Sequence, residues 1–314
     1  MRGIRVVAIG DVNVDVLTTP LAKLPERDSQ VLTEDLSLSV GGCAANFAYA
    51  SSRLGMSSWL QGKVGDDWLG EFITKKLAGV HCSLKVESTC KTGVTLALVL
   101  RDGSRSFITF PGCNRELNFK DINLKLVDGE YLHLPSFSLT GLGQDLYKLI
   151  DHAHSKGMLV SFDPGPEPGG WSKRGIKTVR DIISKVDIVE LNLNEARAIT
   201  GLETEKDVLS ELAKMGPSLI AVKLGERGCI IRKGEEEIKV PSYKIEVVDS
   251  TGAGDVFDAA LVYAHAHEME LEEMGKFANA AGALSCRAPG NSAYPEVGEV
   301  KKLIASGEQY LDFS

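Results

Sequence analysis

Val247-Val248-Asp249-Ser250-Thr251-Gly252-Ala253-Gly254-Asp255-Val256-Phe257 is the stretch that decides which fold and which chemistry we predict for this chain. An apolar run ends, a turn of small residues follows, and the pattern of an amphipathic helix starts near Asp255. Gly252, Ala253 and Gly254 place no bulky side chain over the turn, so its backbone amides can point at an incoming anion. The helix N-terminus adds partial positive charge at the same place. The stretch therefore predicts a site for the negative charge that spreads over a phosphoryl group during its transfer.

Asp255 stands at the predicted start of this helix, where its carboxylate can reach a hydroxyl that lies beside the bound anion. It can take the proton of that hydroxyl while the oxygen attacks, which is the role of a general base. Asp is also a preferred capping residue, and glycine-rich turns commonly precede helices. A lone Gly-x-Gly-Asp would therefore favour a plain helix cap. The longer run Asp-x-Thr-Gly-Ala-Gly-Asp favours the general base.

The run from Asp249 to Asp255 resembles the C-terminal signature of the ribokinase-like (PfkB) family of carbohydrate and nucleoside kinases, and the resemblance extends over nearly the whole chain. It implies a three-layer α/β/α ribokinase-like fold with a mostly parallel central sheet and a small antiparallel β-sheet lid. It implies that Asp255 is the catalytic base and that the amides of Gly252, Ala253 and Gly254 form the anion hole. Asp249 is implied as a ligand of a monovalent cation, with K⁺ as the candidate.

Two segments near the N-terminus predict a surface for substrate hydroxyls. Asp11, Asn13 and Asp15 follow the first apolar run, and strand alternation places all three on one face. The segment Gly41-Gly42-Cys43-Ala44-Ala45-Asn46 precedes a helix, and its glycines let a substrate lie against the backbone. By themselves the paired glycines are equally compatible with a close strand–helix turn. The family resemblance implies substrate contacts for Asn13, Asp15, Gly41, Gly42 and Asn46.

Three further segments predict a binding site for the nucleotide. Asn192-Leu193-Asn194-Glu195 follows an apolar strand and matches the family's Asn-x-x-Glu, which implies that Glu195 binds Mg²⁺ through water; a helix cap is the alternative. Lys223-Leu224-Gly225-Glu226-Arg227-Gly228 resembles the turn beside the phosphates and ribose, although the family often has a small hydroxyl residue in place of Lys223. Small residues around Asn279 leave room for a flat ring, although small residues on a helix more often indicate tight helix packing. The implied nucleotide contacts are Asn192, Lys223, Gly225, Gly228 and Asn279.

Short apolar runs alternate with helical patterns along the chain, which predicts a parallel sheet between two layers of helices. We expect a single domain over residues 1–314 because no linker or repeat divides it. Two stretches, approximately 16–40 and 92–110, instead alternate apolar and polar residues, as antiparallel hairpins do. Arg101-Asp102-Gly103-Ser104 fits the turn of the second hairpin. These stretches are the predicted lid.

Composition narrows the possible partners and the location. A formal charge of −8 with no basic cluster argues against nucleic acid, and no apolar run approaches the ~20 residues of a spanning helix. The six cysteines are scattered without a Cys-x-x-Cys pair, which indicates reduced thiols and a cytoplasmic protein. Gly10 lacks the following glycines of a dinucleotide fingerprint, which excludes a Rossmann dehydrogenase.

The sequence therefore predicts a PfkB-type phosphotransferase that uses ATP or ADP with Mg²⁺ to phosphorylate an alcohol group of a small sugar, sugar derivative or nucleoside. The alternative is a catalytically silent sugar or nucleoside sensor on the same fold, which would be expected to have lost Asp255 or the turn glycines. Exposed β-edges of the lid predict a homodimer. The sequence leaves open which acceptor is used, and whether Arg105, Arg115 or Lys63 recognises an anionic one.

Overall fold

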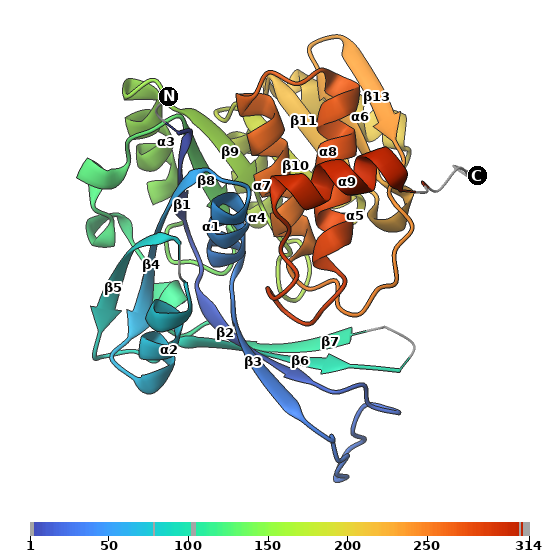
Figure 1. Cartoon of the computed structure of the whole chain (residues 1–314). Coiled ribbons are helices and arrows are strands. Elements are labelled where there is room, and N and C mark those ends of the chain that lie inside the picture. The colour runs from blue at the N-terminus through green and yellow to red at the C-terminus, as the bar shows by residue number, and fades with distance from the viewer. Residues whose placement is uncertain (1–2, 78, 102–104, 308, 310–314) are drawn as a thin grey trace.

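The computed structural model describes residues 3–77, 79–101, 105–307 and 309, and its largest feature is a nine-stranded sheet (Figure 1). Its strands are β1 (Arg5–Ile9), β4 (Ser57–Gly65), β5 (His81–Glu87), β8 (Tyr131–Pro135), β9 (Leu159–Asp163), β10 (Ile188–Asn192), β11 (Leu219–Lys223), β12 (Cys229–Lys233) and β13 (Glu236–Val240). They run in the order β13-β12-β11-β10-β9-β8-β1-β4-β5, and only the β11–β12 and β12–β13 pairs are antiparallel. The mostly parallel central sheet is thus confirmed.

Helices cover both faces of this sheet, because its central strands are apolar on both sides. In β1, Val6 and Ala8 belong to one buried cluster, whereas Val7 and Ile9 belong to the other. The first cluster includes residues of α1 (Cys43–Arg53), α2 (Trp68–Lys76), α7 (Ala253–Ala266), α8 (Leu271–Ser285) and α9 (Val297–Ser306). The second includes residues of α3 (Asp145–Ser155), α4 (Lys173–Ile183), α5 (Leu193–Thr200) and α6 (Glu205–Lys214). The three layers of the predicted fold are therefore present.

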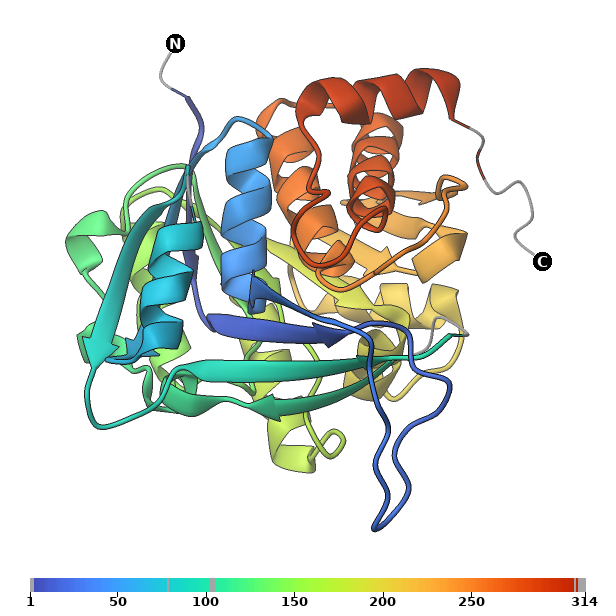
Figure 2. The same ribbon diagram turned by 60° about the horizontal axis from the view of Figure 1, so that its bottom comes forward.

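A second sheet lies beneath the body as a lid (Figures 1 and 2). It has four strands in the order β3-β2-β6-β7, namely β3 (Leu36–Gly41), β2 (Asn13–Thr18), β6 (Gly93–Val99) and β7 (Arg105–Phe110). The prediction of an antiparallel lid is correct for the β2–β3 and β6–β7 hairpins and wrong for the central β2–β6 pair, which is parallel. Two separate hairpins laid side by side produce this mixed sheet. The predicted turn at 101–104 falls mainly on residues 102–104, outside the described part of the chain.

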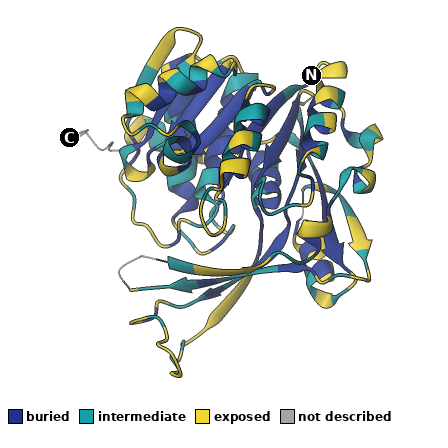
Figure 3. Ribbon diagram, turned by 180° about the vertical axis from the view of Figure 1, so that it is seen from behind, coloured by how far each residue is buried: buried dark blue, intermediate teal, exposed yellow. Residues whose placement is uncertain are grey.

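The two edge strands β5 and β13 have no counterpart in the sequence prediction. β5 carries exposed His81, Lys85 and Val86 among half-buried residues, so it shows no continuous apolar run. Glu236 and Glu237 are the first residues of β13, and both are exposed. Edge strands have one solvated side, and this weakens the apolar signal on which strand prediction depends. Figure 3 shows the contrast between the buried central strands and the exposed outer parts of the lid.

The cysteines depart from the sequence expectation. Cys90 and Cys113 form a disulfide, 23 residues apart in the sequence. Cys90 lies in the β5–β6 connection, and Cys113 in the short 3₁₀ helix that follows β7, where its amide donates to the carbonyl of Lys91 at 2.8 Å. The fold brings two cysteines together that the sequence shows only as scattered. In the described part of the chain, no helix has the length and apolarity to cross a membrane.

We expect loss of this disulfide to lower the free energy of unfolding by about 3 kcal/mol, because the closed loop no longer restricts the unfolded chain. Urea unfolding of the wild type with and without dithiothreitol measures the difference. The double variant Cys90→Ala/Cys113→Ala is the control, since it should unfold at one urea concentration whether or not the reductant is present. Equal stability of oxidised and reduced wild type would contradict the expectation.

Candidate active site

The predicted anion hole is the turn at the start of α7. Gly252 is the N-cap of this helix with φ of +76°, a left-handed conformation that favours glycine. A Cβ on Gly252 would lie 2.2 Å from the hydroxyl of Tyr294. A Cβ on Gly254 would lie 3.4 Å from Lys223 Nζ. The two glycines thus add no side chain of their own where Tyr294 and Lys223 already lie close. The amide of Ala253 donates to the carbonyl of Ser250 at 3.2 Å, and the first amides of a 14-residue helix have no intrahelical partner.

Asp255 lies in the first turn of α7 and is 7% exposed. Its Oδ2 accepts a hydrogen bond from Asn46 Nδ2 at 2.8 Å. Burial raises the pKa of the Asp255 carboxyl to about 7, against the opposing effect of the Asn46 hydrogen bond. A carboxylate with a pKa near the working pH can accept a proton in one step and release it in the next. The geometry therefore suits Asp255 to the predicted role of general base.

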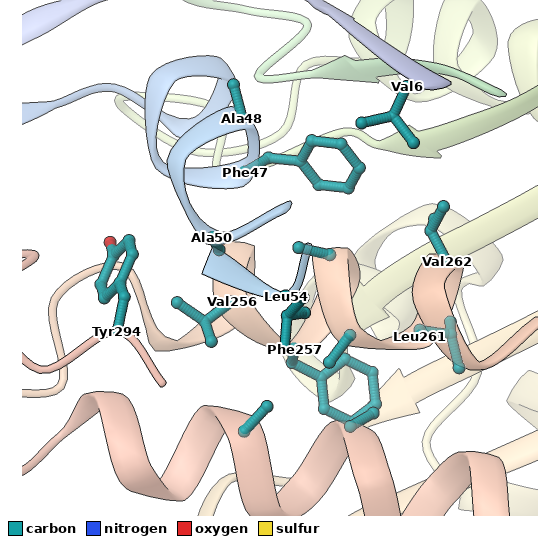
Figure 4. Packing of buried hydrophobic residues seen from close by; sticks show 14 of the residues in the cluster. Val6, Phe47, Ala48, Ala50, Leu54, Val256, Phe257, Leu261, Val262 and Tyr294 are labelled. Carbon is teal, nitrogen blue, oxygen red and sulfur yellow. The ribbon is translucent and has the colours of Figure 1, made fainter. Parts of the chain in front are cut away.

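Packing of α1 against α7 holds Asn46 beside Asp255, although 209 residues separate them. Apolar side chains of the two helices meet in one cluster, which includes Ala50 of α1, its C-cap residue Leu54, and Val256 and Phe257 of α7 (Figure 4). Figure 4 also shows Phe47 of α1 directed towards the sheet. The position of the Asn46 amide is therefore set by the hydrophobic core.

Asp15 is a predicted substrate ligand and lies on the lid strand β2. It is 6% exposed, and a Cβ on Gly41 would lie 2.0 Å from its Oδ2, so the carboxylate rests against bare backbone. Burial, with the nearby charges of Asp11 and Asp255, raises the pKa of Asp15 to about 7. The charge of Asp255 contributes to this rise, so the carboxyls of Asp15 on strand β2 and Asp255 on helix α7 lie near each other. The glycine at position 41 leaves the space that this carboxylate fills.

Asn13 is held by a residue that the sequence did not indicate. Asn114 donates from Nδ2 to Asn13 Oδ1 at 2.8 Å, and its own Oδ1 accepts from the amide of Val12 at 2.9 Å. Asp11 does not share the face of Asn13 and Asp15 as alternation predicts. It accepts hydrogen bonds from the amides of Cys43 and Ala44 at 3.1 and 3.5 Å, and so caps α1. The strand β2 begins only at Asn13, which is why alternation fails at Asp11.

Tyr294 is a further residue at the site that sequence reasoning missed. Its side chain is 3% exposed, and its hydroxyl lies over Gly252 on the anion-hole turn. Burial, together with the charges of Asp255 and Asp15, raises the pKa of the Tyr294 hydroxyl well above its usual value. The residue lies in a loop after α8, outside any motif. Its approach to the turn depends on tertiary packing that no local pattern reveals.

Asn192 and Glu195 form a capping box at the start of α5. The amide of Glu195 donates to Asn192 Oδ1, and the amide of Asn192 donates to Glu195 Oε2, both at 2.9 Å. This is the helix-cap interpretation that the sequence left open. Glu195 is nevertheless 5% exposed, and burial with the charge of Asp163 raises its pKa to about 7. Carboxylates crowded in this way suit a hydrated divalent cation, which would relieve their repulsion.

Lys223 ends β11 beneath the anion-hole turn and belongs to a buried charge cluster. Its Nζ donates to Asp163 Oδ2 at 2.7 Å and to Asp258 Oδ1 at 2.9 Å. Burial alone would lower the pKa of Lys223, but the carboxylates outweigh it and raise it well above its usual value. Glu190, with a pKa raised to about 8 by burial, accepts from Ser161 in the same cluster. Lys223 is therefore a fixed cation, held by Asp163 and Asp258.

Four of the five predicted nucleotide residues surround a cavity of about 360 Å³. Lys223, Gly225, Gly228 and Asn279 line it, as do Gly254 and other residues of the anion-hole turn. Asn279 donates to the carbonyls of Val240 and Pro241 at 3.0 and 3.2 Å, so its amide also fixes one wall. The structure thus brings these predicted residues together around one space that opens onto the phosphoryl-transfer turn. Asn192 is the predicted nucleotide residue that does not line it.

Asp249, the predicted cation ligand, is buried and already paired. Its Oδ1 lies 2.7 Å from Arg105 Nη1 of the lid strand β7 and 2.9 Å from the amide of Thr251. Its Oδ2 accepts from the amide of Gly290 at 2.8 Å. The Asp249 carboxylate therefore accepts hydrogen bonds from one guanidinium and two backbone amides. The donor set does not fit a monovalent cation while Arg105 holds its place.

Comparisons with known proteins identify the family and the fold. The model of the pfkB family carbohydrate kinases matches residues 4–296. Fructokinase-1 of rice is 32% identical over 85% of this chain and 88% of its own, and ribokinase of Bacillus subtilis is 28% identical over 97% and 100%. The structure of Arabidopsis thaliana ribokinase with ribose and ATP superposes with a TM-score of 0.80 at 25% identity, covering 97% and 99% of the two chains.

The three-layer body with its β-sheet lid is the ribokinase-like fold that these relatives share. This chain belongs to the pfkB family of carbohydrate kinases.

Proposed function

We propose that this protein transfers the γ-phosphoryl group of ATP to a hydroxyl of a small sugar or sugar derivative, with Asp255 as the general base. The observation that carries the proposal is the pairing of a buried carboxylate, whose pKa burial raises to about 7, with the open turn Gly252–Gly254. The acceptor oxygen bonds to the γ-phosphorus, the bond to the β-phosphate oxygen breaks, and ADP leaves. Asp255 takes the hydroxyl proton, and the turn amides stabilise the charge on the transferred group.

ATP is proposed as the donor because the nucleotide cavity borders the turn and because the Arabidopsis ribokinase binds ATP with ribose. Asp15 and Asn13 are proposed to bind acceptor hydroxyls from the lid side, and Asn46 to hold the base. Mg²⁺ would supply neutralisation of the phosphate charge during transfer. Glu195 would bind the Mg²⁺ ion through its water ligands, because the Glu195 carboxylate is buried near that of Asp163.

A coupled ADP-release assay tests the proposal, with Mg·ATP and a panel of fructose, ribose, ketodeoxygluconate, sugar phosphates and nucleosides. We expect turnover on one acceptor class, with kcat in the ordinary range of about 1–100 s⁻¹. Mg·ADP as donor is the matched comparison, and it should support no transfer. Acceptor binding in calorimetry without turnover on any of these compounds would instead indicate the sensor.

We further propose that two copies of the chain associate through the lid. Leu36 and Leu38 of β3 and Ile108 and Phe110 of β7 are 44–63% exposed. The register places Leu38, Val16, Leu96 and Ile108 in one row, on the face opposite to the row of Asp15. The outer face of the lid is thus apolar, whereas its inner face serves the site. An exposed apolar face of this kind favours association.

Sedimentation equilibrium of the full chain is expected to show a dimer. The variant Ile108→Glu should shift the mass towards the monomer, because it buries a charge in the proposed interface. Glu226→Gln, on an exposed turn of the body, is the control and should leave the mass unchanged. A wild-type monomer at all concentrations that can be measured would rule out the lid interface.

A further inference from the structure

Arg105 joins the lid to the catalytic turn. It is the first residue of β7, and its side chain is 13% exposed. Its guanidinium contacts Asp249 Oδ1 at 2.7 Å and Thr251 Oγ1 at 2.9 Å, and it also donates to the hydroxyl of Ser250. These three residues immediately precede the anion-hole glycines in the chain. One lid side chain therefore contacts three consecutive residues of the segment that positions the catalytic base.

Asp249 also connects the turn to the loop that follows α8. Its Oδ1 accepts from the amide of Thr251, its Oδ2 accepts from the amide of Gly290, and its own amide donates to the carbonyl of Cys286 at 3.1 Å. The carboxylate is 4% exposed, so an unpaired charge there would be costly. Arg105 balances that charge. The shape of the turn before α7 therefore depends on a cation at Asp249.

A bound monovalent ion could balance the same charge, but it could not do so together with Arg105. Any ion that contacts Asp249 would approach the guanidinium closely and, at a site of low exposure, would meet strong repulsion between like charges. Arg105 also differs from a dissolved ion because it belongs to the lid strand β7, so its position depends on the position of the lid. In this structure the charge at Asp249 is thus balanced by a residue of β7, which lies against the body.

We propose that Arg105 takes the place of a monovalent cation at Asp249, so that closure of the lid completes the anion-hole turn without K⁺. Arg105 is a positioning residue, since it acts on the turn through Asp249 and the hydroxyls of Ser250 and Thr251. The inference rests on the proposed kinase function for its catalytic consequence, but the choice of cation at Asp249 does not depend on it.

The test compares the wild type with Arg105→Gln and Arg105→Lys in buffers that contain K⁺ or tetramethylammonium as the monovalent cation. Wild-type kcat should agree within about twofold between the two buffers. Arg105→Gln should lose at least about tenfold in kcat in tetramethylammonium and recover most of it in K⁺, because the ion then has access to Asp249. Arg105→Lys should remain indifferent to K⁺, since an ammonium can still balance the carboxylate.

Arg101→Gln is the matched control, because Arg101 is an exposed arginine just after β6, at the same end of the hairpin, and should behave as the wild type in both buffers. Thermal unfolding supplies a readout without turnover: K⁺ should raise the midpoint of Arg105→Gln and leave that of the wild type unchanged. Activation of the wild type tenfold by K⁺, or an Arg105→Gln variant that ignores K⁺ in both measurements, would overturn the proposal. A wild type that phosphorylates no acceptor would instead count against the kinase function, while the thermal measurement still decides the question of the cation.

Discussion

Asp255→Asn is expected to lower kcat by about 10³- to 10⁴-fold on the acceptor that the wild type uses, because the amide cannot take the hydroxyl proton. The amide can still accept the hydrogen bond from Asn46, which spans 2.8 Å in the wild type. Acceptor and ATP should therefore bind within a few-fold of wild-type affinity, so that the loss falls on kcat and leaves KM nearly unchanged. Steady-state kinetics with calorimetric binding measure the two separately.

The pH dependence of the wild type provides an independent check on this role. The base must be unprotonated, and burial raises the pKa of Asp255 to about 7. kcat/KM should then fall about tenfold per pH unit below pH 7 and level off above it. Asp15, whose burial raises its pKa to the same value, titrates with it, so the acid limb belongs to the pair.

Asp15→Asn is the control that separates the two carboxyls. It removes one charge near Asp255 and should move the midpoint of the acid limb to lower pH, with a raised KM, while the limb itself persists. An Asp255→Asn variant that keeps more than a tenth of the wild-type kcat would show that another group accepts the proton.

The sequence predicted those parts of the site in which chemistry and local structure share one short segment. Residue 252 must be glycine because its φ is +76° and the Tyr294 hydroxyl lies above it. The sequence motif contains this glycine, so the motif alone indicates the turn. Asp255 follows three residues later at the start of an amphipathic helix. Lys223 follows an apolar run and lies at the carboxyl end of strand β11. Ligands of parallel α/β folds bind at the carboxyl ends of the strands. In such segments local rules and the global fold agree.

Residues that act across the fold could not be predicted in this way. Asn114 reaches Asn13 over 101 residues, and Arg105 reaches Asp249 over 144. Tyr294 approaches Gly252 from a loop that has no periodicity. Each of these contacts depends on how the lid, the body and the C-terminal loop pack together, and a single sequence contains no signal of that packing. Asp11 shows the reverse case, since a polar residue in the predicted pattern turned out to cap a helix.

Lys223→Met is expected to lower the free energy of unfolding by about 3–5 kcal/mol, because it removes the cation from a buried pair and leaves a carboxylate unpaired. Asp163 carries most of this penalty. Burial tends to raise its pKa, but Lys223 at 2.7 Å, together with hydrogen bonds from Asp258 and the amide of Gly165, outweighs burial and lowers it, so the Asp163 carboxylate is ionised in the native protein. Urea unfolding at neutral pH measures the loss.

The double variant Lys223→Met/Asp163→Asn distinguishes lost pairing from lost packing. It removes both charges of the pair, so most of the destabilisation should disappear, with a coupling of at least about 1 kcal/mol in the double-mutant cycle. Activity should not return with stability, because the Lys223 ammonium lies beneath Gly254, where charge develops during transfer. A double variant as unstable as Lys223→Met would show that packing, and not the Lys223–Asp163 ion pair, stabilises this cluster. That result would contradict the role of Lys223 as a fixed cation beneath the turn.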